Sequence, residues 1–307
     1  MFSDTRITCA YLFIISRYGY PPPVTATVQH IREMAAAGFT SMELEGIGPD
    51  NIRYLFENRQ QVADTLDAYG VEVPVFCTVL PGMSAVADGE RLENLEFFEM
   101  GCETAKFLGA AGVLDNGPLL PLHYPADQQV KRHYNGEALA SLLPPPGFEW
   151  PVYWHELTGT FREACRIAAR YGLDYHLHPC EGCLTATTDA FLLFADAVNA
   201  PNLKFNLDTA NQFLVHDNLP LSLMRLTDRI NYIHISDNTG SRVEHLPPGA
   251  GNIPWDAFFA TLRDTGFRGR LAIDVGGEEN GAADPEDAYR RTAVWLEQQL
   301  ERFEILT

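Results

Sequence analysis

Hydrophobic runs rich in β-branched and aromatic residues recur along the chain, and each is followed by a stretch with apolar residues every three or four positions. The runs have the length of buried strands, whereas the longer stretches have the spacing of amphipathic helices. Strands that alternate with helices predict a parallel sheet with crossover helices. Eight strands are expected, at Ile7–Ser16, Thr40–Leu44, Val71–Val79, Gly112–Asn116, Leu173–His178, Leu203–Leu207, Ile230–Ile235 and Arg270–Val275.

Two of the intervening stretches show the helical spacing clearly. One predicted helix begins at Val24 and ends at Gly38, and another lies in FREACRIAARYG and ends at Gly172. Four short segments, AAGF, AYGV, RYGL and DTGF, each place a glycine where a helix turns into the next strand. The residues expected on the buried faces are Val24, Val28, Ile31 and Ala35 in the first helix, and Phe161, Ala164, Cys165 and Ala168 in the second.

Eight strand–helix units of similar size favour one α/β domain, a single (β/α)8 TIM barrel over residues 1–307. The length agrees, because such barrels have roughly 250 residues or more. The alternative is a doubly wound open sheet. It is disfavoured because no G-x-G-x-x-G segment follows the first strand.

One long segment, residues 117–152, interrupts this rhythm after the fourth strand. It holds seven of the 20 prolines, together with aromatic and histidine residues such as His123, Tyr124, His133 and Tyr134. Segments that follow a strand border the active site of a barrel. We therefore expect a lid-like, Pro-rich insertion that covers the substrate, with a passive insertion as the alternative.

Polar residues stand where the predicted strands end, the edge at which these barrels carry their active sites. Four consecutive strands, the fifth to the eighth, end in His, Asp, His and Asp, a set suited to manganese, iron, cobalt or zinc. For each residue the alternative is a helix cap or a loop hydrogen bond, and capping fits Asp208 in particular. His176, deeper in the fifth strand, is expected to be a supporting or core histidine. The strand-end candidates are Glu43, Asp115, Asn116, His178, Asp208, His234 and Asp274.

The most specific stretch is IHISDNTGSRVEHLPPGAGNIPWDAFFATLRDTGFRGRLAIDV. It resembles the xylose isomerase-like barrel superfamily, which contains sugar epimerases and isomerases, sugar or cyclitol dehydratases, and endonuclease IV. AAGFTSMELEG and LDTAN resemble the second and sixth strands of the same superfamily, with Glu43 in its acidic position. The resemblance covers the chain outside residues 117–152 and implies the same barrel fold.

The resemblance also implies a ligand set. The single-metal enzymes of the family hold their ion with Glu, Asp, His and Glu on strands five to eight. By position these are His178, Asp208, His234 and Asp274, so the middle two match and the outer two differ. Both replacements are good ligands. We expect one divalent ion, with Mn²⁺ favoured and Zn²⁺, Co²⁺, Fe²⁺ or Mg²⁺ as alternatives.

Further residues are candidates for contact with the substrate. His245 holds a loop position that often faces the substrate in the family, and the alternative is a loop-stabilising histidine. Glu181 lies three residues past the fifth strand and is a candidate replacement for the missing glutamate. Cys180 and Cys183 form one C-x-x-C pair, a weak signal for a redox or zinc role. The catalytic candidates are His178, Asp274, Glu43 and His245, and the substrate-binding candidates are His245, Asn116, Glu181 and Trp255.

Charge narrows the range of partners. The formal net charge of -19 disfavours nucleic acids and anionic membranes, whose binding requires basic side chains.

The apolar run Ala10–Ile15 is too short to span a bilayer, and no secretory signal pattern surrounds it. The six cysteines are scattered, which is typical of reduced thiols in a cytoplasmic protein. We expect a small sugar or polyol substrate, and leave a homo- or hetero-oligomer open.

These features predict a metal-dependent sugar isomerase or epimerase that acts through an enediolate on a ketose or keto-sugar. The close alternative is a lyase, either a dehydratase or an enzyme that cleaves a keto-glycoside or C-glycoside by β-elimination, because a metal-bound His178 is a poor proton shuttle. A non-catalytic sugar-binding subunit is disfavoured by the retained ligands. An endonuclease IV-like nuclease is disfavoured by the acidic charge, and by Asn211 and Val243, which stand where the resemblance implies further ligands.

Overall fold

The structure is a computed structural model that describes residues 2, 4–124, 136–277, 280 and 284–305. Its strands are Ile7–Cys9 (β1), Leu44–Ile47 (β2), Val75–Val79 (β3), Gly112–Asn116 (β4), Asp174–His178 (β5), Leu203–Asp208 (β6), Tyr232–Ile235 (β7) and Arg270–Ile273 (β8). Its α-helices are Leu12–Tyr18 (α1), Thr27–Ala36 (α2), Pro49–Glu57 (α3), Arg59–Tyr69 (α4), Asp88–Phe107 (α5), Gly136–Ser141 (α6), Trp150–Arg170 (α7), Thr188–Val198 (α8), Thr209–Leu214 (α9), Leu219–Arg225 (α10), Trp255–Asp264 (α11) and Pro285–Arg302 (α12).

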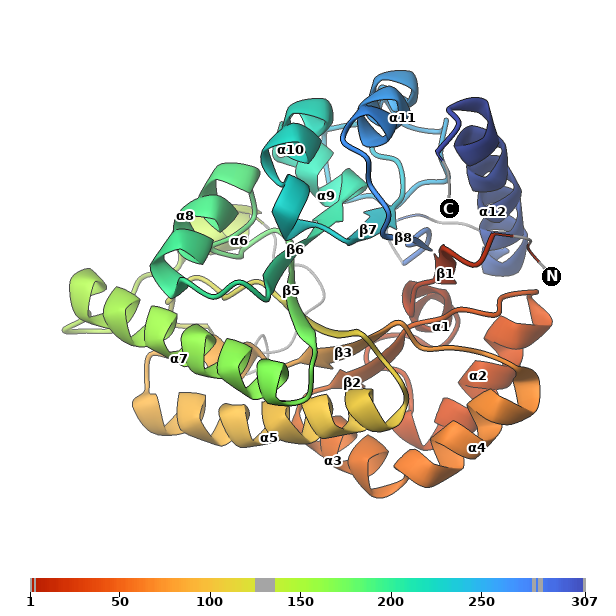
Figure 1. Ribbon diagram of the computed structural model, residues 1–307. Coiled ribbons are helices and arrows are strands. Elements are labelled where there is room, and N and C mark those ends of the chain that lie inside the picture. The colour runs from red at the N-terminus through yellow and green to blue at the C-terminus, as the bar shows by residue number, and fades with distance from the viewer. Residues whose placement is uncertain (1, 3, 125–135, 278–279, 281–283, 306–307) are drawn as a thin grey trace. The chain divides into compact units, whose positions relative to one another are not determined.

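The strands form one sheet in the order β1-β8-β7-β6-β5-β4-β3-β2. Pairs such as β3 with β4 and β7 with β8 are parallel. Cys9, at the end of β1, forms a parallel bridge to Met42, just before β2, so the strand order closes on itself. Helices separate successive strands along the chain, as Figure 1 shows. This is the order of a (β/α)8 barrel, and the predicted fold class is confirmed.

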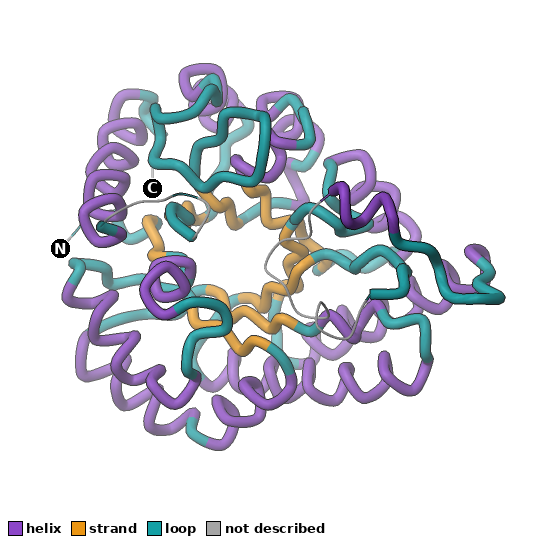
Figure 2. Tube along the Cα trace, turned by 180° about the vertical axis from the view of Figure 1, so that it is seen from behind, coloured by secondary structure: helices purple, strands orange, loops and turns teal. Residues whose placement is uncertain are grey.

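The chain forms two compact parts, each with its own helices and strands. One consists of Met1–Leu44, Gln60–Pro74 and Phe205–Thr307, and the other of Glu45–Arg59 and Val75–Lys204. In the first part, α12 packs against α1, β1 and β8. In the second part, α5 and α7 pack against each other, with α5 also contacting β3 and α7 contacting β5. Figure 2 distinguishes the helices, strands and loops of the chain by colour.

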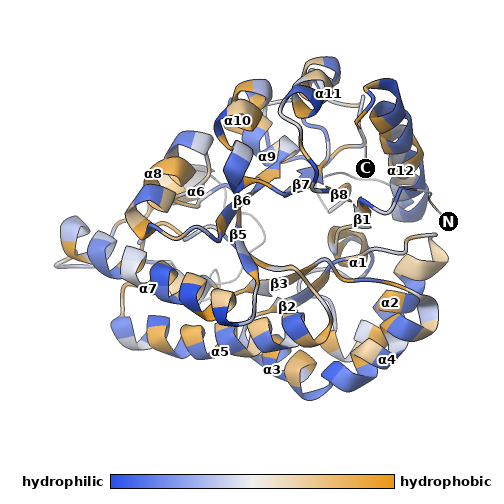
Figure 3. Cartoon of the chain, in the orientation of Figure 1, coloured by the Kyte–Doolittle hydropathy of each residue, from blue (hydrophilic) through white to orange (hydrophobic). Residues whose placement is uncertain are grey.

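Strands and helices differ in how they bury their residues. Strands β3 and β7 are buried along their whole length, as parallel strands are when both faces are covered. Helices mix hydrophobic and hydrophilic residues, visible as alternating colours in Figure 3, and bury one face. In α7 that face includes the four predicted residues, which are confirmed as buried: Phe161, Ala164, Cys165 and Ala168.

The four glycines predicted to turn a helix into a strand all have a positive φ angle, between 62° and 102°. Residues with a Cβ rarely adopt this left-handed conformation, which explains why glycine ends these helices. They are Gly38, Gly70, Gly172 and Gly266.

The first predicted strand, Ile7–Ser16, is wrong beyond its first residues. Only Ile7–Cys9 is a strand, and the apolar residues that follow form helix α1, Leu12–Tyr18. The first four residues of that helix are buried. A short, continuously apolar run has no periodicity that would distinguish a strand from a helix. The strand prediction for residues after Cys9 was wrong for this reason.

Two other predicted strands are displaced. The second was expected at Thr40–Leu44, whereas β2 is Leu44–Ile47, preceded by isolated bridges at Ser41 and Met42. The third was expected to begin at Val71, whereas β3 begins at Val75. Pro74 precedes it and has no N–H to donate to a neighbouring strand, which accounts for the late start.

The first predicted helix has a different buried face from the one expected. Ile31 is buried as predicted, but Val24, Val28 and Ala35 are only partly buried. Val24 lies in a 3-10 turn ahead of α2. The buried residues of α2 are instead Thr27, His30, Ile31 and Met34, and on this buried side the Nδ1 atom of His30 lies 2.9 Å from the Tyr11 hydroxyl.

The predicted insertion is described only in part. Residues 125–135, with His133 and Tyr134, lie outside the described residues. Of the remainder, Gly136–Ser141 forms α6 and the last residues begin α7. Among the described helices, none is both long and apolar enough to cross a membrane.

Candidate metal centre

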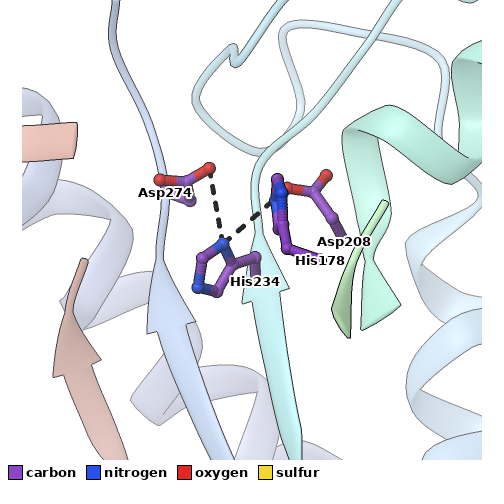
Figure 4. Close-up of side chains that lie close together, drawn as sticks. All are labelled: His178, Asp208, His234 and Asp274. Carbon is purple, nitrogen blue, oxygen red and sulfur yellow. Dashed lines mark ion pairs between the residues drawn. The ribbon is translucent and has the colours of Figure 1, made fainter. Parts of the chain in front are cut away.

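Four side chains at consecutive strand ends bring their donor atoms together. His178 and Asp208 are the last residues of β5 and β6, His234 lies in β7, and Asp274 directly follows β8. Asp208 is the register partner of His234, which places the two side chains at the same level of the sheet. One donor atom from each of the four residues lies within 4.8 Å of the others. Figure 4 shows the four side chains, with the two ion pairs of His234 as dashed lines. Three of the four residues are buried.

The imidazole of His234 is held between carboxylates on both of its nitrogens. Nδ1 lies 3.8 Å from Oδ2 of Asp208 and 3.6 Å from Oδ2 of Asp274. Nε2 lies 2.7 Å from Oε1 of Glu43, whose Oε2 accepts a hydrogen bond from the backbone N–H of Tyr11. Burial lowers the pKa of His234, but the charges of Glu43 and Asp274 outweigh burial and raise the pKa well above its usual value.

The two carboxylate oxygens of Asp208 have different partners. Oδ1 accepts a hydrogen bond of 2.8 Å from the backbone N–H of Asn211 and so caps helix α9. Oδ2 faces His234 and lies 4.0 Å from Nε2 of His245. The capping role that the sequence suggested is therefore compatible with a ligand role for the other oxygen.

His245 approaches the same carboxylates from the loop after β7. Its Nε2 lies 3.6 Å from Oδ2 of Asp274, and the side chain is only 1% exposed. The loop is fixed beside β7 because Leu246 exchanges two backbone hydrogen bonds with Asp237, of 2.7 and 3.0 Å. The carbonyl of His245 also accepts a hydrogen bond from the Gly276 N–H. The structure thus brings this predicted residue next to the candidate ligands.

Asp237 organises this loop, a role that sequence reasoning missed. It accepts hydrogen bonds from the backbone N–H groups of Gly249 and Ile253 and from the indole N–H of Trp255. A Cβ on Gly251 would collide with Oδ1 of Asp237. The glycine at this position was the sequence feature that could have indicated the close packing around Asp237. Trp255, predicted to bind substrate, is tied to Asp237, and its ring centroid lies 5.1 Å from that of Trp295, which favours a packing role.

In the other part of the chain, Asn116 lies beside His178. The two residues are register partners in β4 and β5, and Nδ1 of His178 lies 3.2 Å from Oδ1 of Asn116. A hydrogen bond donated by Nδ1 orients the ring and keeps Nε2 available for a ligand. Asn116 was predicted to contact substrate, and its contact with Nδ1 of His178 is that of a residue that orients a candidate ligand. His176 is buried with Nδ1 3.1 Å from the carbonyl oxygen of Val113, consistent with the predicted core role.

Two other carboxyl groups at this end of the strands are not within the four-residue cluster. Glu181 is partly buried in the turn that follows β5. Asp115, at the end of β4, is 2% exposed and accepts a hydrogen bond from the Leu80 N–H. Burial raises the pKa of Asp115 well above its usual value, although the Leu80 and Asn116 N–H groups lower it. Asp115 is therefore a buried structural carboxyl group.

The donor set fits a divalent metal ion. Two ligand atoms that are each about 2.1 Å from one ion lie roughly 3–4 Å apart, and the nitrogen–oxygen distances around His234 are 3.6 and 3.8 Å. Two carboxylates balance the charge of a divalent cation, and two imidazoles favour a transition metal. Glu43 and Asn116 supply the outer hydrogen bonds that metal-binding histidines usually make.

A family model described as a xylose isomerase-like TIM barrel matches residues 31–299. The chain belongs to this family. The match spans most of the helices and strands, including the four strand ends that carry the candidate ligands.

Curated relatives within the family share short segments with the chain. An L-ribulose 3-epimerase of Methylomonas sp. is 30% identical over 83 residues, which is 27% of this chain and 27% of that protein. A D-psicose 3-epimerase of Ruminiclostridium cellulolyticum is 23% identical over 124 residues, which is 39% of this chain and 41% of that protein. The aligned segments thus span less than half of either relative.

Solved structures of the family share the fold along nearly the whole chain. The structure of an L-ribulose 3-epimerase has a TM-score of 0.73 at 15% identity, with 97% of this chain and 95% of that chain covered. A 3-keto-D-glucoside 4-epimerase from E. coli has a TM-score of 0.71 at 19% identity, with 96% and 100% covered. A probable 3-DHS dehydratase from Bacillus anthracis has a TM-score of 0.67 at 18% identity, with 95% and 98% covered. At these identities the likeness describes the fold alone.

Proposed function

We propose that the protein is a divalent-metal-dependent isomerase or epimerase of a ketose or keto-sugar. The observation that carries this proposal is the convergence of two imidazoles and two carboxylates from consecutive strand ends. Relatives named as 3-epimerases of ribulose and psicose, and a similar D-allulose 3-epimerase solved with D-allulose, support a small sugar as substrate. Mn²⁺ is the ion we favour.

Four residues would hold the ion: His178, Asp208, His234 and Asp274. A bound divalent ion polarises a sugar carbonyl and makes the hydrogen on the neighbouring carbon more acidic. Glu43 fixes the ring of His234 through Nε2, so that Nδ1 points toward both aspartates. Asn116 fixes the ring of His178 in the same manner through Nδ1.

His245 is the residue that we assign to proton transfer, together with Asp274. The Nε2 atom of His245 lies 3.6 Å from Oδ2 of Asp274, beside the candidate ligands where the sugar would bind under this proposal. An imidazole there takes the proton from the carbon next to the carbonyl, which leaves an enediolate. Return of a proton to the opposite face of that carbon gives the epimer. Return to the neighbouring carbon gives the isomer.

A lyase is the second candidate, and the placement of His178 favours it. Its Nδ1 donates a hydrogen bond to Asn116 and its Nε2 is needed as a ligand, so His178 has no nitrogen available to exchange a proton with the substrate. An epimerase needs proton donors on both faces of one carbon, whereas β-elimination needs one base and an acid for the leaving group. Loss of water or of an aglycone from the enediolate is the corresponding reaction.

The other expectations from the sequence belong to this proposal. Residues 117–152 are proposed as a lid-like insertion of one domain spanning residues 1–307. Glu181 is retained as a candidate for contact with the substrate. A net charge of -19 opposes a nuclease function. We place the enzyme in the cytoplasm.

Turnover in D₂O separates the two reactions. The protein is loaded with Mn²⁺ and incubated with a panel of free ketohexoses and with a 3-keto-glycoside. Deuterium incorporation together with a new sugar diastereomer supports the isomerase or epimerase. Release of water or an aglycone with no epimer identifies the lyase. Full turnover by an Asp208→Asn variant that is stripped of metal contradicts metal dependence for either reaction.

A further inference from the structure

Cys180 and Cys183 form a thiol pair that the proposed function does not use. Their Sγ atoms lie 2.8 Å apart, and both side chains are buried, with 5% and 6% exposure. Both cysteines are free thiols. The pair lies in the turn immediately after His178, the last residue of β5.

The backbone between the two cysteines is already shaped for a disulfide. The N–H of Cys183 donates a hydrogen bond of 3.1 Å to the carbonyl of Cys180, which closes a β-turn. Gly182, the third residue of the turn, has a φ angle of 90°, a conformation that glycine adopts without strain. The ends of a β-turn are less than about 7 Å apart between Cα atoms, and disulfides span roughly 4.4–6.8 Å between theirs. The sulfur atoms therefore need only a small approach to bond.

This turn is fastened to the segment that leaves β4. The Gly117 N–H donates to the carbonyl of His178 at 2.8 Å, and the Leu184 N–H donates to the carbonyl of Pro118 at 2.7 Å. The Cys183 thiol itself lies 3.0 Å from the carbonyl oxygen of Gly117. A Cβ on Gly117 would collide with the Thr185 hydroxyl, so the two segments are in close contact. A change at the sulfur atoms is consequently transmitted to Gly117 and to the end of β5.

We propose that Cys180 and Cys183 form a reversible disulfide by exchange with a low-molecular-weight disulfide, and that this bond weakens metal binding at the neighbouring His178. One cysteine attacks the small disulfide as a thiolate, forms a mixed disulfide and releases one thiol. The second cysteine attacks the mixed disulfide, forms the Cys180–Cys183 bond and releases the second thiol. Two protein thiols are oxidised and one small disulfide is reduced to two thiols.

The bond alters the surroundings of His178 in two ways. It removes the thiol hydrogen that faces the Gly117 carbonyl, and it draws the two sulfur atoms together within the turn. Gly117 directly follows Asn116, whose Oδ1 contacts Nδ1 of His178. Loss of the outer hydrogen bond to a metal-binding histidine typically weakens metal binding about 10–100-fold. This second step rests on the proposed metal site, whereas formation of the disulfide does not.

Thiol mapping tests the first step. The full-length protein is equilibrated in glutathione buffers from fully reduced to fully oxidised, the remaining thiols are blocked with N-ethylmaleimide, and the peptides are identified by mass spectrometry. We expect loss of two of the six thiols, a peptide linked through Cys180 and Cys183, and reversal by dithiothreitol. Cys180→Ala and Cys183→Ala each abolish the linked peptide, whereas Cys102→Ser, the matched control, retains it. The proposal is overturned if both cysteines stay reactive in excess oxidised glutathione, or if a bound metal ion protects them.

Calorimetric titration with Mn²⁺ tests the second step. Reduced and oxidised wild-type protein are compared, with the Cys183→Ala variant carried through the same oxidation. We expect roughly tenfold weaker binding by the oxidised wild type only. Equal affinities in the two states overturn the coupling to His178. If the reduced protein binds no Mn²⁺, the proposed function fails, and the thiol mapping still decides whether the disulfide forms.

Discussion

Glu43 and His234 show how one buried pair determines which imidazole nitrogen faces a metal ion. Glu43 is 2% exposed and its Oε1 lies 2.7 Å from Nε2 of His234. A carboxylate in this position makes the opposite nitrogen a better ligand and prevents the ring from rotating. The strand-end pattern of the sequence presented Glu43 as a catalytic candidate, and its contacts with His234 and Tyr11 favour a positioning role.

Replacement of Glu43 by glutamine tests that role. Glu43→Gln keeps the size of the side chain and removes its charge, so we expect the fold to persist and the affinity for Mn²⁺ to fall about 10–100-fold. Calorimetric titration measures the affinity, and circular dichroism checks the fold. Glu96→Gln, on the exposed face of α5, is the matched control and should leave the affinity unchanged. An unaltered affinity for Glu43→Gln would show that the carboxylate does not support the ligand.

Asp115 gives a prediction about pH and stability. Burial raises its pKa in the folded protein above the value of about 3.9 in the unfolded chain. The folded protein therefore binds the carboxyl proton of Asp115 more tightly than the unfolded chain does. The resulting contribution to the free energy of unfolding is full below the unfolded-state pKa and is lost as the pH rises from there to the folded-state pKa. Asparagine has no such proton but keeps an oxygen for the Leu80 N–H. We expect the wild type to gain stability relative to Asp115→Asn as the pH falls, by at most about 1.4 kcal/mol per pH unit.

Urea unfolding of both proteins at a series of pH values measures this difference. The comparison cancels the contributions of all other titrating groups, which the two proteins share. A difference in unfolding free energy that stays constant with pH would mean that Asp115 is ionised with an ordinary pKa in the folded state.

At the scale of elements, the loop between β7 and α11 depends on Asp237. Its carboxylate accepts hydrogen bonds from three backbone N–H groups and from one indole N–H, and it thereby holds in place the loop that carries His245. The expected consequence of its removal is local, because these donors belong to a single connection between a strand and a helix. The fold of this loop explains how His245, which lies far from any strand end, comes next to the candidate ligands.

Removal of the Asp237 carboxylate should loosen that loop. In Asp237→Ala the buried N–H groups lose their acceptor, which costs roughly 1–3 kcal/mol of unfolding free energy for each group left unsatisfied. We expect a lower unfolding free energy and faster amide hydrogen exchange over residues 238–255, together with a lower kcat/KM. Asp264→Ala, an exposed position at the end of α11, is the control. Unchanged exchange in the loop would assign its order to other contacts.

At the scale of the whole molecule, metal binding should be visible as stability. A ligand that binds only the folded state stabilises it by about 2.7 kcal/mol when present at a hundredfold excess over Kd. We expect chelation to lower the Tm by a few degrees and added Mn²⁺ to restore it. Asp208→Asn should show neither change. A Tm that does not respond to chelation or to Mn²⁺ would contradict the candidate metal centre.

The sequence by itself determined the features that depend on local periodicity. The alternation of strands and helices, the glycines that end helices and the four polar strand ends were all readable because each is encoded within about ten neighbouring residues. The alternation left few topologies open, and the closed barrel was favoured among them over a doubly wound sheet. Placement of His178, Asp208, His234 and Asp274 at strand ends required only this local information.

Only the tertiary structure decided what those side chains contact. Glu43 and His234 are 191 positions apart, and no periodicity indicates that their side chains meet. The run that follows Cys9 forms a helix whose first four residues are buried, and burial by distant segments is invisible in a short window of sequence. Asn116, Trp255 and Asp237 likewise took their roles from hydrogen bonds to other elements. Residue type restricts which contacts a side chain is able to make, and the folded chain determines which of them form.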